Sequence, residues 1–121
     1  MSFSPLALQH IQNPRGSGPI DGATHVGQAG DPGGGPYVKF WLVVEGARIV
    51  RASWDCNGCP AAVASSSIAA YLLVGRTVEQ ALSVTPEDLT LIVGELPAGY
   101  ADRPQMAVRA IHNTLEGVGK P

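Results

Sequence analysis

Hydrophobic and polar residues alternate along two neighbouring stretches of the chain, 37–44 and 47–54. In the first stretch the apolar residues that share one face are Val38, Phe40, Leu42 and Val44. In the second they are Val50, Ala52 and Trp54. Alternation with a period of two residues is typical of a strand that buries one face. The turn signal Glu45-Gly46 separates the stretches, so they are predicted to pair as an antiparallel β-hairpin. A shorter edge strand is predicted at 25–29.

Beyond residue 60 the hydrophobic period becomes that of a helix. Pro60 suits the first helical position, where its missing N–H is harmless, and Gly75 provides the stop. The stripe between them consists of Ala61, Ala64, Ile68 and Leu72. Thr77 and Thr85 each precede a Gln or Asp by three residues, which indicates two capped helix starts.

Two more helices are predicted at the ends of the chain. A last helix over 104–116 presents on one side Ala107, Ile111, Thr114 and Val118. A short N-terminal helix over 3–12 is expected to pack through Leu6, Leu8 and Ile11. Because the strands precede most of the helices, the order predicts an α+β fold: a small antiparallel three-stranded sheet with helices packed on one face.

The length and charge of the chain exclude several classes of protein. A chain of 121 residues fits one domain, 1–121. Eight basic and ten acidic residues give a net charge of −2 with no basic run, so neither nucleic acid nor an anionic membrane is expected as a partner. No apolar run approaches the ~20 residues that a membrane span needs. The first residues lack the pattern of a signal peptide, so a cytoplasmic location is expected.

The two cysteines of the chain, Cys56 and Cys59, form a C-x-x-C pair. A structural disulfide is disfavoured in a reducing cytosol, which favours metal binding or thiol chemistry. The pair is half of a structural zinc site, and no second pair follows. The plain alternative is two small residues at a turn between a strand and a helix. The three serines 65–67 have no nucleophile elbow around them, so a serine hydrolase is not expected and no catalytic residue is predicted.

Several motifs together resemble the NifU/IscU-type iron–sulfur cluster scaffolds over about residues 8–118. They are Asn13-Pro14-Arg15, Gly30-Asp31-Pro32, the hairpin, the run 58–67 that reads G-C-P-A-A-V-A-S-S-S, Gly75-Arg76-Thr77 and Leu96-Pro97. The run 58–67 is the most specific of them. The resemblance implies the same α+β fold and a role in iron–sulfur cluster assembly. Cysteine desulfurase or an iron–sulfur acceptor protein are the partners that it implies.

The resemblance also implies that most cluster ligands of the family are missing here. Such scaffolds hold a [2Fe–2S] cluster with three cysteines, helped by an Asp and a His. Only Cys59 is kept; the other ligand positions fall on Gly34, Pro36, Asp102 and Arg103. Cys56 is an added thiol, and the three glycines 33–35 leave room for another molecule to approach.

These residues leave three functions open. Cys59 begins a helix, where free N–H groups and the helix dipole favour the thiolate. Cys56, Cys59 and Asp102 would make a weak metal site opposed by Arg103, whereas two chains in a homodimer would supply four thiolates for a shared [2Fe–2S] cluster or zinc. The leading prediction is therefore a cluster assembly or carrier protein. The alternatives are a persulfide relay, in which Cys59 accepts sulfur and Cys56 resolves it, and an interaction module that binds no metal.

Overall fold

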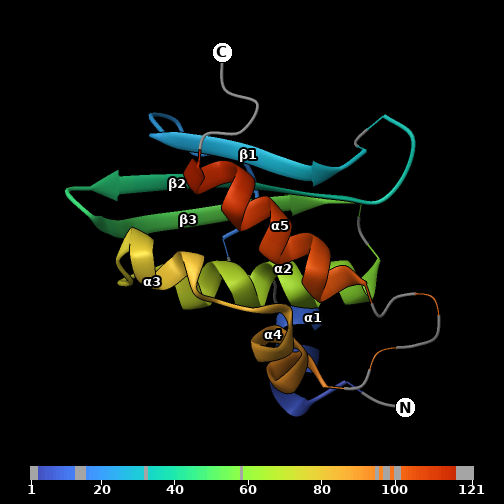
Figure 1. Ribbon diagram of the computed structural model, residues 1–121. Helices are drawn as coiled ribbons and strands as arrows, with labels where there is room; N and C mark the ends of the chain where they lie inside the picture. The colour runs from blue at the N-terminus through green and yellow to red at the C-terminus, as the bar shows by residue number, and fades with distance from the viewer. Residues whose placement is uncertain are drawn as a thin grey trace.

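A three-stranded antiparallel sheet forms one layer of the protein, and the helices form the other (Figure 1). The computed structural model describes residues 3–12, 16–31, 33–57, 59–94, 96, 99 and 102–116. The elements in chain order are α1 (Pro5–Gln12), β1 (His25–Gly30), β2 (Tyr37–Glu45), β3 (Arg48–Cys56), α2 (Pro60–Leu73), α3 (Val78–Leu82), α4 (Pro86–Val93) and α5 (Arg103–Glu116). Figure 1 shows the helices on one face of the sheet, so the predicted α+β class is confirmed. Among the described residues, no helix is both long and apolar enough to cross a bilayer.

The strands are ordered β1-β2-β3, and β2 pairs with both neighbours. The predicted inward residues of β2 are buried as far as Leu42, whereas Val44 is half-buried. In β3 the prediction fails at one position: Ile49 is buried, and Val50 is only half-buried. A β-bulge between Val43 and Val44 shifts the register, so that Val44 pairs with Ile49. An inserted residue reverses the alternation beyond it, which simple periodicity cannot anticipate.

Helix α5 lies very close to β1 because Gly27 has no side chain. A Cβ at Gly27 would lie 2.6 Å from Thr114 Cα and 2.7 Å from its backbone nitrogen. At the same edge Asn113 Nδ2 donates to the carbonyl of Gln28 at 2.7 Å. The inward side of α5 is as predicted over Ala107, Ile111 and Thr114, which are buried; Val118 lies outside the described residues.

Helix α2 is the centre of the molecule, enclosed by β3, α1, α4 and α5. The predicted stripe is buried over Ala61, Ala64 and Ile68, and Leu72 is half-buried. Burial extends well beyond the stripe, because the three serines 65–67 are also fully buried. A helix that is covered on most sides has small residues around its circumference, so a single apolar stripe describes only part of its contacts.

Helix α1 is rotated relative to the prediction. Leu6 and Leu8 are 41% and 45% exposed, whereas Ala7 and His10 face the core. The start of the helix is tied to α4, since Ser4 N donates to the Val93 carbonyl at 2.9 Å. Inside the fold, His10 Nδ1 and Ser67 Oγ are hydrogen-bonded at 2.6 Å. These tertiary bonds set which face of the helix turns inward.

The capping signals are confirmed at both predicted helix starts. Thr77 Oγ1 accepts from Gln80 N and Thr85 Oγ1 accepts from Asp88 N, each at 3.1 Å. Both capping boxes are reciprocal. Gly75, the predicted stop, has φ of 91°, a left-handed conformation that favours glycine.

Candidate functional site

Cys56 is the last residue of β3, at the end of the sheet from which the chain crosses to α2. It pairs with Val38 of β2, so its side chain lies on the face that the helices cover. The residue is 9% exposed. Its backbone N–H donates to Asp55 Oδ1 at 2.9 Å, which fixes the end of the strand. Cys56 is thus a buried thiol beside the core that forms no disulfide.

Cys59 caps the N-terminus of α2. Its Sγ accepts a hydrogen bond from Ala62 N at 3.4 Å, and Pro60 occupies the first turn. Cys59 is half-buried and free. The sulfur is thus the side-chain acceptor that caps the first turn of α2.

Arg103 brings a positive charge to the same sulfur. It is the first residue of α5, is only 8% exposed, and its side chain hydrogen-bonds to Cys59. Its Nη1 also forms an ion pair with Asp102 Oδ1 at 2.5 Å. Burial lowers the pKa of Arg103, but the hydrogen bond to Cys59 and the charges of Asp102 and Cys59 outweigh it, so the pKa is raised overall. Figure 1 shows α2 and α5 beginning at the same end of the molecule.

The loop between β1 and β2 leaves the sheet at this end, since Gly30 pairs with Tyr37, next to the pair of Val38 and Cys56. Gly34 N and Gly35 N donate to the Asp31 carbonyl, and Asp31 N donates to the carbonyl of Pro36. A Cβ at Gly34 would lie 2.7 Å from Asp31 Oδ2. A larger residue at Gly34 would therefore have to displace that carboxylate.

The residues of one chain do not fit a metal ion. Among the described residues, no three His, Cys, Asp or Glu side chains gather closely enough to hold one. Asp102, the predicted third ligand, is 55% exposed at its side chain and pairs with Arg103. The group next to Cys59 is a guanidinium, which binds no cation and repels one.

The histidines lie apart from the thiols or in another role. His25 begins β1 opposite Leu42, at the far end of the sheet from Cys56, and its Nδ1 contacts Thr24 Oγ1 at 2.8 Å. His112 lies 3.7 Å from Glu116 on α5. His10 of α1 is buried against α2, where its Nδ1 is hydrogen-bonded with Ser67 Oγ.

Next to the thiols, on the rim of the sheet, Tyr37 and Asp55 form a polar contact. Tyr37 Oη donates to Asp55 Oδ2 at 3.0 Å. This bond raises the pKa of Tyr37, with smaller contributions from desolvation and from the negative charges of Asp55 and Cys56.

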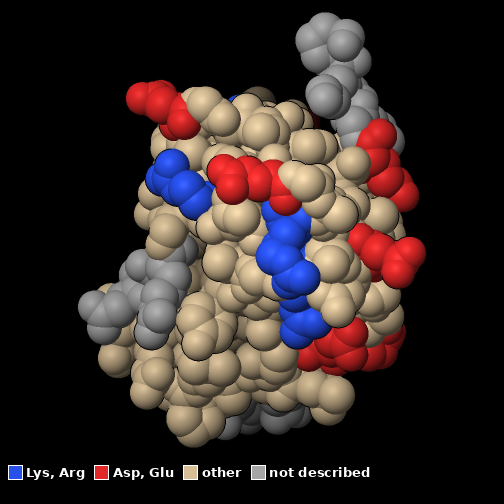
Figure 2. Space-filling model, turned by 90° about the vertical axis from the view of Figure 1, so that its left-hand side faces the viewer, with Lys and Arg blue, Asp and Glu red and all other residues tan. Residues whose placement is uncertain are grey.

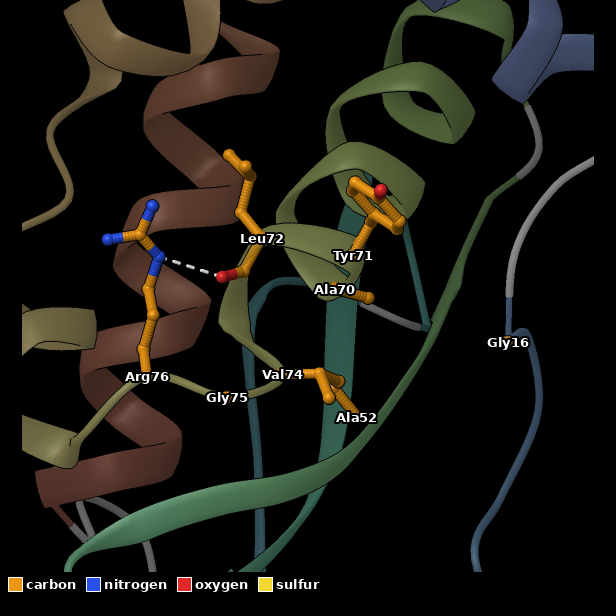
Figure 3. A pocket seen from close by; sticks show the side chains of 8 residues that line it. All are labelled: Gly16, Ala52, Ala70, Tyr71, Leu72, Val74, Gly75 and Arg76. Atoms are coloured by element: carbon orange, nitrogen blue, oxygen red, sulfur yellow. Dashed lines mark hydrogen bonds between the residues drawn. The ribbon is translucent and has the colours of Figure 1, made fainter.

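A pocket lies at the other end of α2. It has a volume of about 650 Å³ and is lined by Gly16, Ala52, Ala70, Tyr71, Leu72, Val74, Gly75 and Arg76. Figure 3 shows Tyr71 and Val74 on the open side, while the Arg76 side chain points away to the Leu72 carbonyl, to which its Nε donates at 2.8 Å. Neither cysteine lines this pocket.

Figure 2, which views the end of the molecule opposite the thiols, shows Lys and Arg side chains flanked by Asp and Glu, so this face carries both signs of charge.

Sequence reasoning missed the contact between Arg103 and Cys59. It placed Arg103 only as the position of a lost ligand that would oppose a dication. The available signal was that two helices start where the sheet ends, one with a cysteine and one with an arginine. That these starts touch depends on how α5 packs against α2.

Comparison with known proteins matches residues 2–118 to the NifU-like N-terminal domain. IscU 1 of Archaeoglobus fulgidus, an iron–sulfur cluster assembly scaffold protein, is 32% identical over 113 residues, which cover 93% of this chain and 74% of that protein. The scaffold protein IscU of Aquifex aeolicus is 29% identical over 116 residues, with coverage of 94% and 74%. The nitrogen fixation protein NifU of Cereibacter sphaeroides is 36% identical over 92 residues, covering 76% of this chain and 37% of its own length.

Solved structures share the fold at low sequence identity. The N-terminal part of a NifU-like protein from Brucella abortus superposes with a TM-score of 0.71 at 15% identity, covering 95% of this chain and 92% of that chain. A candidate scaffold protein for the SUF system from Fervidobacterium islandicum reaches 0.68 at 18% identity, with coverage of 93% and 95%. At these identities the likeness supports the fold alone.

Proposed function

We propose that this protein takes part in iron–sulfur cluster assembly, because its chain belongs to the family of NifU-like N-terminal domains. The IscU relatives are scaffold proteins, which bind and hand over a cargo without catalysing a reaction. The protein is accordingly not an enzyme. The observation that carries the proposal is the pair of cysteines, Cys56 and Cys59, which form no disulfide and lie at the end of the sheet where α2 begins.

The first candidate cargo is a [2Fe–2S] cluster held between two copies of the chain. Each copy contributes Cys56 and Cys59, so a homodimer supplies the four thiolates that such a cluster requires. The same arrangement would accept one zinc ion. The position of the thiols at one end of the molecule, beside the glycine-rich loop, supports this geometry.

The second candidate cargo is sulfane sulfur, and the contact between Arg103 and Cys59 favours it. The Cys59 thiolate would attack the terminal sulfur of a persulfide on a cysteine desulfurase. A new S–S bond forms at Cys59, and the donor cysteine leaves as a thiolate. Cys56 would then attack Cys59 Sγ, releasing hydrosulfide for an iron–sulfur acceptor protein and leaving a disulfide that a cellular thiol reductant reopens.

One experiment separates the candidates. The purified protein is incubated without oxygen with a cysteine desulfurase, cysteine and ferrous iron, and its mass, iron, acid-labile sulfide and oligomeric state are measured. A dimer with stoichiometric iron and sulfide supports the shared cluster. A monomer that releases sulfide, and that keeps 32 Da at Cys59 once Cys56 is replaced by alanine, supports the relay. If neither cargo appears, the protein is an interaction module and the proposal is wrong.

The expected compartment remains the cytoplasm. The two cysteines form no disulfide with each other, and either role requires that they stay reduced between rounds of loading.

A further inference from the structure

Arg103 occupies a place next to Cys59 where a thiol-bound metal would need to sit. We propose that Arg103 determines the kind of cargo that Cys59 carries, by pairing with an anionic sulfur and keeping cations away from Sγ. This inference rests on the proposed sulfur chemistry of Cys59. It goes further by assigning to one residue the choice between sulfur and metal.

Two donors from different helices converge on the Cys59 sulfur. Ala62 N, in the first turn of α2, donates to Sγ at 3.4 Å. The side chain of Arg103, from the start of α5, hydrogen-bonds to the same residue. Because the two helices are packed against each other, neither donor depends on a mobile loop. Such a pair of donors is suited to a negatively charged sulfur, as a thiolate or as the persulfide formed from it.

Burial makes the charge of Arg103 effective. The residue is 8% exposed, so water screens its guanidinium much less than that of a surface arginine. Asp102 holds the other side of the group through the ion pair at 2.5 Å and is itself 55% exposed. Asp102 thus anchors the guanidinium from the solvent side, and the remaining N–H groups are available to Cys59.

The same charge opposes a metal. A divalent ion bound to Cys59 would lie within a few ångströms of a permanent cation, since arginine stays protonated in proteins. A persulfide avoids this repulsion, because its terminal sulfur carries negative charge. The sulfur can be loaded chemically: the Cys59 thiolate attacks an inorganic polysulfide, a sulfur–sulfur bond forms at Sγ, and the polysulfide leaves one sulfur shorter with the bonding electron pair.

The test uses the full chain and two probes that need no protein partner. Inorganic polysulfide loads Cys59, and mass spectrometry follows the loss of the added sulfur over time. Co²⁺ titration, followed by thiolate-to-metal absorption, reports cation affinity. The variants are Arg103→Gln, Arg103→Met and Arg103→Lys, with Arg109→Gln as the matched control, because Arg109 is exposed on the same helix.

The neutral variants Arg103→Gln and Arg103→Met should lose persulfide sulfur faster and bind Co²⁺ more tightly than the unsubstituted protein. Removing a charge-assisted hydrogen bond should speed the loss of persulfide sulfur by on the order of tenfold or more. The Kd for Co²⁺ should fall by a similar factor, again roughly tenfold. Arg103→Lys keeps the charge and should stay near the unsubstituted protein in both assays, and Arg109→Gln should change neither.

Opposite results would overturn the proposal. If the neutral variants behave like Arg109→Gln in both assays while keeping their circular dichroism, Arg103 does not select the cargo. If one neutral variant fails to fold, the other decides, and a change shared by Arg103→Lys points to packing alone. A protein that passes both assays but acquires neither persulfide sulfur nor a cluster in the desulfurase reaction would refute the proposed function and leave the role of Arg103 standing.

Discussion

The two ends of helix α2 have opposite characters. At its start, Cys59, Cys56 and Arg103 bring sulfur and charge together in a buried setting. At its end, about 20 Å away along the helix axis, a pocket is lined mainly by apolar and small residues, with Tyr71 55% exposed. The pocket and the two thiols thus lie at opposite ends of α2, and the proposed chemistry lies at the end where side chains pack closely.

The difference follows from what each end of a helix offers. The N-terminus presents unpaired N–H groups that attract negative charge, and Cys59 caps these groups in α2, while Arg103 brings a separate positive charge to the same sulfur. At the C-terminus, Gly75 turns the chain and Arg48 Nη1 donates to its carbonyl, so the polar groups there are used in the fold itself. Substitutions along α2 should therefore separate loading from stability.

The largest effect is expected at the start of the helix. Cys59→Ser should abolish loading of sulfur or cluster, yet leave stability nearly unchanged, because serine is a favoured N-cap residue and keeps an acceptor for Ala62 N. Intact-mass analysis after incubation with desulfurase or polysulfide measures it. Val74→Ala, at the pocket end, is the control and should load normally. Loading of Cys59→Ser at the level of the control would move the site away from Cys59.

Cys56→Ala distinguishes the two candidate cargoes. In the relay, a persulfide should accumulate on Cys59 because the resolving thiol is gone. In the shared cluster, half of the four thiolates are lost and no stable cluster should form. Iron, sulfide and mass analysis of this variant give the answer, and normal cluster formation would contradict both expectations.

Substitutions in the middle of α2 should change the free energy of unfolding by up to about 1–3 kcal/mol without affecting the loading of Cys59. Ser67 bonds to buried His10 at 2.6 Å, so Ser67→Ala should destabilise the protein by that amount. Ser66 Oγ is buried with no hydrogen-bond partner among the described residues, and Ser66→Ala should be neutral or stabilising by about 1 kcal/mol. Urea unfolding of both variants tests this. Equal destabilisation would show that the hydroxyl of Ser66 is satisfied in solution.

Beyond the pocket end, loss of a helix cap should cost about 1 kcal/mol. Thr77→Ala removes the acceptor of Gln80 N and breaks the capping box of α3. The free energy of unfolding should fall while loading stays normal, and Thr77→Ser is the matched control that keeps the hydroxyl. A loading defect in Thr77→Ala would mean that the two ends of α2 are coupled.

The smallest effect concerns pH at the thiol end. The hydrogen bond to Asp55 raises the pKa of Tyr37 above 10.0 in the folded protein. The bond therefore stabilises the fold fully below that pH, and the stabilisation is lost as the pH rises through the folded pKa. Tyrosinate absorbance should appear at lower pH in Asp55→Ala than in the unsubstituted protein. Coincident titration curves would show that the bond does not form in solution.

Local patterns in the sequence were enough for most elements of the fold. The alternation over 37–44, Pro60 at the start of α2 and the two threonine caps each correspond to an observed element. Such signals depend on neighbours within one turn or one strand pair, where backbone geometry fixes the period. The motifs around Cys59 were likewise sufficient to indicate the family, which the match over residues 2–118 confirms.

Long-range packing decided the rest. Ile49 replaced Val50 as the inward residue because of a bulge, and α1 turned Ala7 and His10 inward because its start is bonded to α4. The placement of Arg103 against Cys59 belongs to the same class, since residues far apart in sequence meet only when α5 packs on α2. By itself the sequence determined the elements and the two thiols, because these depend on local chemistry. Only the tertiary structure decided that a buried cation stands beside Cys59, because that contact exists only after the helices have packed.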